Sequence, residues 1–377
     1  MSSRVVVAGT GVHPFGRFDG VPVTEMGVRA VRDALADAGN PEFQAAFCAT
    51  VYSGVAAGHK VLGALGTTGM PIVNVEAGCA SGGAALMLAA GAIRAGQYDT
   101  VLVFGMEKMP KGIIRSSFFE PWREQAGLAV TPAYFALRAQ RLMRESGVTK
   151  EHLARIVVKN RANGVDNLIA MFRKATTIDD VLASRLVCEP LHLHMLCSPN
   201  EGAAAVVLRR AGGKHAGDPG VAAAAHRSHL PGPVHGEATP LSGTDDTAVT
   251  PPSTLATEAA FGEAGIGPDD LDLVECQDTD AAREVLAYEE LGLCARGDGA
   301  RLVEDGTTLR GGALPVNVSG GLLSKGEPLG ASALGQVVEL ADQLRERAGP
   351  RQVPGARVGL AHTVGRGANA AVVILTH

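Results

Sequence analysis

The chain alternates short apolar segments with longer segments rich in alanine and glycine, and the pattern runs twice along its length. Such alternation is typical of an α/β fold whose sheet is largely buried. The predicted strands are residues 4–8, 100–104, 203–208, 221–226, 271–276, 358–361 and 370–375. The predicted helices outside the middle region are residues 24–38, 84–94, 253–264 and 330–347.

Two of these segments share a more specific layout. A glycine-rich turn at residues 78–83 leads into one helix, and another at residues 326–330 leads into a second. We therefore expect two distantly similar halves, residues 1–212 and 213–377, joined by the polar segment 209–220. Residues 106–199 interrupt the first half with helical patterns at 131–147, 149–162 and 177–186, which we interpret as an inserted lobe covering one face of that half.

Composition limits the class of protein. With 377 residues, 46% of them hydrophobic, the chain can bury a large core. A formal charge of −5 gives no bulk attraction for nucleic acid or an anionic membrane. No apolar run reaches the roughly 18 residues of a spanning helix, and the apolar stretch at the start is too short for a signal peptide. Six cysteines without a CxxC pair argue against zinc or disulfides and predict reduced thiols in a cytoplasmic protein.

Cys79 is the candidate nucleophile. It lies among small residues just before a predicted helix, where unpaired amides and the helix dipole would lower the pKa of a thiol. Its own amide could donate to a developing oxyanion. From the local sequence alone, a buried inert cysteine remains an equal alternative.

Several blocks carry a resemblance to a known family. Residues 74–83 (NVEAGCASGG) and 101–109 (VLVFGMEKM) resemble the nucleophile region of the thiolase superfamily, in the branch related to sterol carrier protein X. Further similar blocks follow in order: FRK at 172–174, VLASR at 181–185, CSPNEGAAA at 197–205, YEELGLC at 288–294 and NVSGGLLSKG at 317–326. The resemblance covers essentially the whole chain.

The resemblance implies a fold and a chemistry. The fold is five-layered, αβαβα, built from two repeated halves, and such enzymes usually form dimers. They carry an acyl group on the cysteine, here Cys79, and make or break a C–C bond beside a thioester, with coenzyme A as cosubstrate and no metal. Members of this branch often need a small zinc-ribbon/OB-fold partner subunit.

Three further positions normally complete the site in this family. Two of them carry a different residue in this chain, and the third matches. Gln277 stands where relatives carry His or Asn; it can donate a hydrogen bond to an oxyanion but cannot shuttle a proton. Glu327 stands in place of the histidine that activates the cysteine, in GEPLG at 326–330. A carboxylate kept protonated part of the time by burial could serve first as base and then as donor. His362 fits the slot that handles the Cα proton or the leaving CoA thiol.

Other positions are expected at the edge of this site. Gly365 and Gly367 lie in a turn whose amides could add an oxyanion donor, and Ser324 and His59 are expected beside the substrate. Arg173 and Lys174 could meet the phosphates of CoA, although a solvated charge pair is an equally good interpretation.

Three functions fit these residues. The first is a thiolase-type acyltransferase acting through acyl-Cys79 on a bulky β-ketoacyl-CoA, aromatic or steroid-like, for example of the benzoylsuccinyl-CoA kind. The second is retro-aldol cleavage of a β-hydroxyacyl-CoA with Glu327 as base, which needs no covalent intermediate. The third is a non-catalytic acyl-CoA-binding scaffold subunit, which the altered Gln277 and Glu327 positions favour and the intact Cys79 loop opposes.

Overall fold

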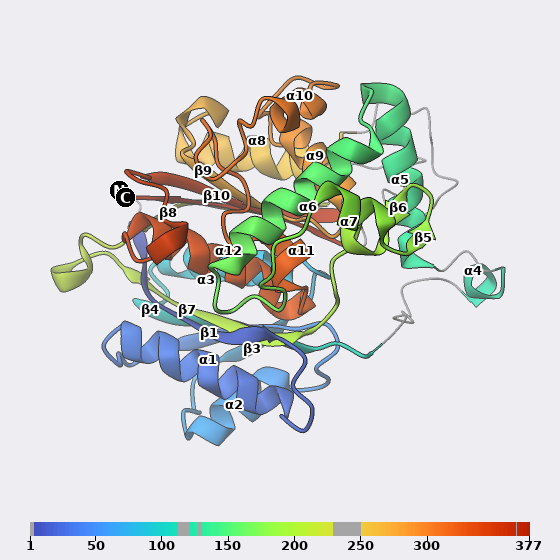
Figure 1. The fold of residues 1–377 in the computed structure, drawn as a ribbon. Helices are drawn as coiled ribbons and strands as arrows, with labels where there is room; N and C mark the ends of the chain where they lie inside the picture. The colour runs from blue at the N-terminus through green and yellow to red at the C-terminus, as the bar shows by residue number, and fades with distance from the viewer. Residues whose placement is uncertain (1–3, 112–120, 127–129, 229–249, 367) are drawn as a thin grey trace.

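The computed structural model describes residues 4–111, 121–126, 130–228, 250–366 and 368–377, and stacks them in layers (Figure 1). The strands are β1 (Val5–Gly16), β2 (Ala45–Ala49), β3 (Ile72–Val75), β4 (Thr100–Lys108), β5 (Leu186–Cys188), β6 (Leu191–His192), β7 (Glu201–Arg210), β8 (Gly220–Ser228), β9 (Leu273–Cys276), β10 (Val358–Gly365) and β11 (Asn369–Thr376). The α-helices are α1 (Val23–Asp37), α2 (Ala57–Leu65), α3 (Ser81–Arg94), α4 (Pro121–Gln125), α5 (Thr131–Ser146), α6 (Lys150–Val165), α7 (Ile178–Ala183), α8 (Pro252–Ala264), α9 (Ala281–Glu290), α10 (Gly299–Glu304), α11 (Gly321–Lys325) and α12 (Leu329–Leu344).

The main sheet repeats one strand arrangement. Its order is β3-β2-β4-β7-β1-β8-β11-β10-β9, and its two halves meet where Val6 of β1 pairs with Gly220 of β8. In the first half β2 and β4 are parallel, and β7 and β1 follow as antiparallel neighbours. In the second half β9 and β10 are parallel, and β11 and β8 follow in the same way. The predicted repeat of two similar halves is confirmed.

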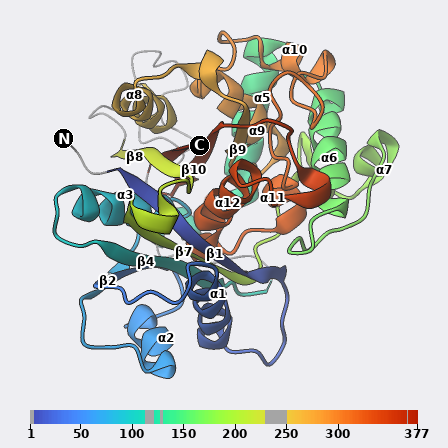
Figure 2. The ribbon, with the colours of Figure 1, turned by 90° about the vertical axis from the view of Figure 1, so that its left-hand side faces the viewer.

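Helices separate and cover the two half-sheets. Helices α3 and α12 lie between them, α1 and α2 cover the outer face of the first half, and α8 and α9 cover the outer face of the second (Figures 1 and 2). The five predicted αβαβα layers are therefore present. The connection between β7 and β8 contains the predicted boundary at residue 212, which stays a prediction as a domain limit.

Small residues allow the central helices to pack closely. A Cβ added at Gly82 would lie 3.0 Å from Leu334 of α12, and one added at Gly83 would lie 2.5 Å from Ala371 of β11. At Gly82 the neighbouring side chains would have to give by a few tenths of an ångström, and at Gly83 the packed segments would have to shift apart. The alanine and glycine content of the sequence thus reflects this buried middle layer, whose α3 helix begins directly after Cys79.

The inserted lobe lies elsewhere than predicted. Its helices α5, α6 and α7 form where the sequence predicted helices, but α5 packs against α9, and α6 packs against α9, α10 and α11, all of the second half (Figure 1). Helix α7 packs against α6. The cause is a buried polar seam: Lys159 of α6 forms an ion pair with Glu284 of α9, and Asn160 donates to Asp278. Within the described ranges, no helix is long and apolar enough to cross a membrane.

Candidate active site

The Cys79 loop connects β3 to the central helix α3. Gly78 has φ +59°, and a Cβ there would lie 2.7 Å from the Arg366 amide nitrogen, so glycine is required on both counts. Ser81 closes the loop: its hydroxyl accepts from the Ala77 amide at 2.8 Å and donates to the Gly78 carbonyl at 2.5 Å. The loop therefore holds Cys79 rigidly at the start of α3, as the sequence predicted.

Cys79, Gln277 and Glu327 meet in one cavity of about 1190 Å³. Gln277 follows β9, and its side chain is fixed at both ends. Its Oε1 accepts from the Val364 amide at 2.7 Å, and its Nε2 donates to Glu327 Oε1 at 2.9 Å. The amide orientation is thus set, and Gln277 also reaches the Cys79 thiol. Three residues distant in sequence therefore form one hydrogen-bonded group.

The electrostatics of Cys79 differ from the local prediction. Burial, then the charge of Glu327 and its hydrogen bond with the thiol, raise the pKa of Cys79 well above its ordinary value. The Arg366 guanidinium and the Gln277 amide act in the opposite direction but do not prevail. The expected lowering by the helix start is wrong for the resting site, because loss of water and a nearby carboxylate outweigh it. The thiol consequently needs a base to ionise.

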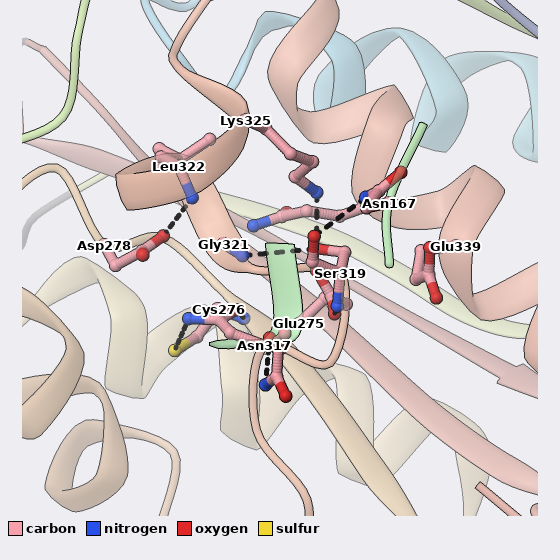
Figure 3. Close-up of polar contacts among 12 residues, drawn as sticks. Asn167, Glu275, Cys276, Asp278, Asn317, Ser319, Gly321, Leu322, Lys325 and Glu339 are labelled. Atoms are coloured by element: carbon pink, nitrogen blue, oxygen red, sulfur yellow. Dashed lines mark hydrogen bonds and ion pairs between the residues drawn. The ribbon is translucent and has the colours of Figure 1, made fainter. Parts of the chain in front are cut away.

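A buried polar network links Glu275 and Asp278, on either side of Gln277, to the segment 319–325 that precedes Glu327 (Figure 3). Glu275, two residues before Gln277, accepts from the Ser319 amide at 3.0 Å and forms an ion pair with Lys325 at 3.5 Å. Asp278, the residue that follows Gln277, accepts from the Leu322 amide at 2.6 Å. The end of β9 and the segment leading to Glu327 are thus tied together inside the protein.

We expect Lys325→Met to destabilise the protein strongly. Lys325 and Glu275 are both fully buried, so removing the cation leaves the Glu275 carboxylate without its partner. A loss of about 3 kcal/mol in the free energy of unfolding is expected, measured by urea denaturation. The control is Arg29→Met, which breaks the exposed Arg29–Asp33 pair and should cost less than about 1 kcal/mol. Equal losses in both variants would contradict the structural role of the buried pair.

His362 lies outside this cavity. Its ring is fully buried, and Nε2 lies 3.0 Å from the Ser253 hydroxyl at the start of α8. Burial, and then the charge of Arg283, lower its pKa to about 3, against which Glu290 acts weakly. The imidazole of His362 therefore does not lie at the acid–base position that the sequence predicted, because it faces α8 instead of the cavity. Strand β10 reaches the site through the Val364 amide.

This environment predicts a pH-dependent stability. Folded His362 stays neutral down to about pH 3, whereas in the unfolded chain it binds a proton below about 6.5. Its contribution is thus complete above pH 6.5 and is lost as the pH falls towards 3. Between these values the free energy of unfolding of His362→Leu should fall less than that of wild type, by a few kcal/mol. His59→Leu, at an exposed position, should follow the wild-type curve.

The remaining predicted residues divide between the cavity and elsewhere. Lys174 lines the cavity, whereas its neighbour Arg173 is exposed and is not part of the wall. Ser324 is buried and donates to the Asn160 carbonyl at 2.9 Å, so it anchors α6 instead of contacting substrate. His59 is exposed on α2, outside the wall. Gly365 is buried against the Ala77 carbonyl beside the Cys79 loop, and Gly367 lies outside the described residues.

The wall contains functional side chains that sequence reasoning missed. Arg366 faces the cavity and donates to the Thr131 hydroxyl at 2.9 Å, and Cys197 lies 3.4 Å from Glu327 Oε2. Apolar and cationic side chains of the lobe complete the wall: Pro132, Phe135, Arg161, Phe172, Arg185, Val187, Leu193 and His194. No three His, Cys, Asp or Glu side chains in the described part of the chain gather as metal ligands would.

Family models match both halves of the chain. The model described as the thiolase N-terminal domain matches residues 5–211, and the model described as thiolase C-terminal domain-like matches residues 237–377. Together they cover most of the chain, in the order in which the two repeated halves occur.

Individual relatives agree over the full length. The chain is 35% identical to acetyl-CoA acetyltransferase of Methanothermobacter thermautotrophicus, over 99% of each chain. It is 35% identical to benzoylsuccinyl-CoA thiolase subunit BbsB of Thauera aromatica, over 98% of this chain and 97% of that one. It is also 35% identical to sterol carrier protein 2 of Bos taurus, over 100% of this chain and 72% of the relative. A solved Ltp2-ChsH2(DUF35) aldolase shares the fold, with TM-score 0.85 and 24% identity over 99% and 97% of the chains.

Proposed function

This chain belongs to the thiolase family and is an acyltransferase, and we propose that it makes or breaks a C–C bond beside a CoA thioester through an acyl-Cys79 intermediate. The observation that carries the proposal is the convergence of Cys79, Gln277 and Glu327 in one cavity. Glu327 is placed to take the thiol proton, and Gln277 to donate to the oxyanion formed at the attacked carbonyl.

The size and lining of the cavity support a bulky acyl substrate. At about 1190 Å³, with aromatic walls at Tyr52, Phe135 and Phe172, it has room for more than an acetyl group. The Thauera aromatica relative is named for benzoylsuccinyl-CoA. We therefore propose an aromatic or steroid-like β-ketoacyl-CoA as substrate.

The cations of the lobe suit the phosphates of CoA. Arg161, Lys174 and Arg185 line the same cavity. Burial lowers the pKa of Arg161 to about 10, and its guanidinium lies 4.0 Å from the centre of the Phe172 ring. A desolvated guanidinium is well suited to an anionic partner. We propose that Lys174, rather than Arg173, acts with Arg161 at this end.

The proposal is tested by trapping the intermediate. The protein is incubated with acetoacetyl-CoA and with larger aromatic β-ketoacyl-CoAs, with and without free CoA, and the Cys79 peptide is analysed by mass spectrometry. An acyl adduct on Cys79 that disappears on addition of CoA is the expected result. Absence of any adduct across the substrate series, with Cys79 still reactive to iodoacetamide, would refute the covalent mechanism.

Retro-aldol cleavage of a β-hydroxyacyl-CoA is the second candidate. The raised pKa of Cys79 and the fixed carboxylate of Glu327 favour it, because this reaction needs a base and no thiolate. Glu327 would take the substrate hydroxyl proton while the C–C bond breaks, and would return it to the α-carbon of the acyl-CoA enolate that is released. If Cys79→Ala keeps its activity on β-hydroxyacyl-CoA while Glu327→Gln loses it, this candidate replaces the first.

We also propose assembly as a homodimer, with a small zinc-ribbon/OB-fold partner subunit, in the cytoplasm. The Thauera relative is named as a subunit, and all six cysteines of this chain are unpaired. The edge strand β3 and the adjacent helix α3 expose Val73 and Leu88, 42% and 43% accessible. An edge strand with apolar neighbours is suited to pairing with a second copy.

The dimer proposal predicts a change in mass in solution. Leu88→Glu should weaken dimerisation by about 2 kcal/mol or more, because it places a carboxylate in an apolar contact. Light scattering coupled to size exclusion measures the shift towards monomer. Leu168→Glu, at a 74% exposed site on the lobe, is the matched control and should stay dimeric. A monomeric wild type at micromolar concentration would contradict the proposal.

A further inference from the structure

We propose that Cys197 is a second acid–base residue of this site, which protonates the carbon released by C–C cleavage and then takes the proton of the incoming CoA thiol. The inference rests on the proposed function and adds to it a residue that the resemblance did not indicate. It begins from the observation that two thiols, not one, lie at the Glu327 carboxylate.

The three side chains form a shared arrangement. Cys197 Sγ donates to Glu327 Oε2 at 3.4 Å, while Gln277 occupies Oε1 at 2.9 Å. Cys79 contacts the same carboxylate and lines the same cavity as Cys197. Substrate bound at Cys79 is therefore within reach of the Cys197 thiol.

Backbone contacts fix Cys197 relative to Glu327. The Glu327 amide donates to the Ser198 carbonyl at 2.9 Å, and the Cys197 amide donates to the Thr279 carbonyl at 2.9 Å. The Asn200 side chain donates to the Lys325 carbonyl at 2.8 Å. Cys197 thus belongs to the same rigid assembly as Gln277 and Glu327, as a proton-transfer group must.

The site needs such a group. His362, which the resemblance placed in this role, is bonded to Ser253 in another layer. Two further titratable groups of the wall are engaged within the lobe: Asp180 caps α7 through Thr177, and burial, then the charge of Arg161, lowers the pKa of His194. Among the described titratable side chains of the wall other than Cys79, Cys197 is the one that is hydrogen-bonded to Glu327.

The charge of Glu327 links the ionisation of Cys79 to that of Cys197. Burial, and after it the charge of the Glu327 carboxylate, raises the pKa of both Cys79 and Cys197. When Glu327 takes the proton of Cys79, its negative charge is neutralised. The Cys197 thiol then becomes easier to deprotonate at the step that requires a proton at carbon.

The proton and bond changes balance. Glu327 accepts the Cys79 proton, and the thiolate attacks the ketone carbonyl of the β-ketoacyl-CoA. The C–C bond breaks, leaving acyl-Cys79 and an enolate, which takes the proton of Cys197. The Cys197 thiolate accepts the proton of CoA, the CoA thiolate attacks acyl-Cys79, and Cys79 regains its proton from Glu327.

The test separates proton transfer at carbon from nucleophile reactivity. Wild type, Cys197→Ala, Cys197→Ser and the control Cys294→Ala, which lies outside the cavity wall, are incubated with acetyl-CoA in D₂O, and deuterium at the α-carbon is measured. Alkylation of Cys79 by iodoacetamide is followed in parallel. We expect exchange to fall about 100-fold or more in both Cys197 variants, with alkylation of Cys79 and exchange by Cys294→Ala unchanged.

Each other outcome has a defined meaning. Exchange at the wild-type rate in Cys197→Ala overturns the inference, while acyl-Cys79 trapped in wild type leaves the proposed function standing. Equal losses of exchange and of Cys79 alkylation would mean that Cys197 only positions Glu327, which also overturns it. Wild type that neither exchanges the α-proton nor forms acyl-Cys79 refutes both proposals.

Discussion

Replacing Cys79 with alanine is expected to lower kcat by about 10³-fold or more, with little change in KM. The thiol supplies the covalent intermediate, so its removal deletes the step itself and leaves binding in the cavity intact. Steady-state thiolysis of a β-ketoacyl-CoA, followed by loss of the absorbance of the β-keto thioester enolate, measures the effect. Little of this loss should appear as destabilisation, because alanine fits beside the small residues of the loop.

A serine at the same position gives a sharper comparison. Cys79→Ser keeps the shape and the hydrogen bond to Glu327, but the hydroxyl is a weaker acid than the thiol and ionises less readily. We expect it to be about as inactive as Cys79→Ala in thiolysis. The control is Cys294→Ala, a half-buried cysteine outside the cavity wall, which should retain wild-type rates. Retention of most thiolysis by Cys79→Ala would refute the acyl-Cys79 intermediate.

The sequence predicted the fold and part of the site, for identifiable reasons. The buried strands and the alanine- and glycine-rich central helices leave strong periodic signals, so most elements near them were predicted within a few residues. The strands β2 and β3 were not, because with five and four residues they are too short to give a clear periodic signal. Helix α9 was also not predicted. The packing of the lobe depends on buried pairs such as Lys159–Glu284, whose partners are remote in the chain.

The site residues likewise divide into those that local sequence predicted and those that depend on contacts between remote segments. Gln277 and Glu327 were found because their flanking residues match family blocks, and both lie at Cys79. Cys197 was missed, because its contact with Glu327 is set by a bridge between Pro199 and Glu327 that no local pattern reveals. His362 was assigned by position in a motif. Successive side chains in a strand point to opposite faces, so the motif alone could not fix which face its ring takes.

Glu327→Gln is expected to reduce thiolysis by about 10² to 10⁴-fold while making Cys79 easier to ionise. The amide keeps nearly the same shape but cannot accept the thiol proton. At the same time, the loss of the carboxylate removes a charge that raises the pKa of Cys79. The pH midpoint for alkylation of Cys79 by iodoacetamide should therefore move down relative to wild type.

The opposite directions of these two effects make the test informative. If Glu327 served only to tune the thiol, a variant with a more readily ionised Cys79 should be at least as active as wild type near neutral pH. If it is the base, activity falls even though the thiolate is easier to form, and raising the pH restores part of it. Asp342→Asn is a charge-matched control on α12, outside the cavity wall, where burial raises the carboxyl pKa to about 7. It should leave the alkylation midpoint of Cys79 unchanged, which ties any shift seen in Glu327→Gln to the carboxylate that lies between the two thiols.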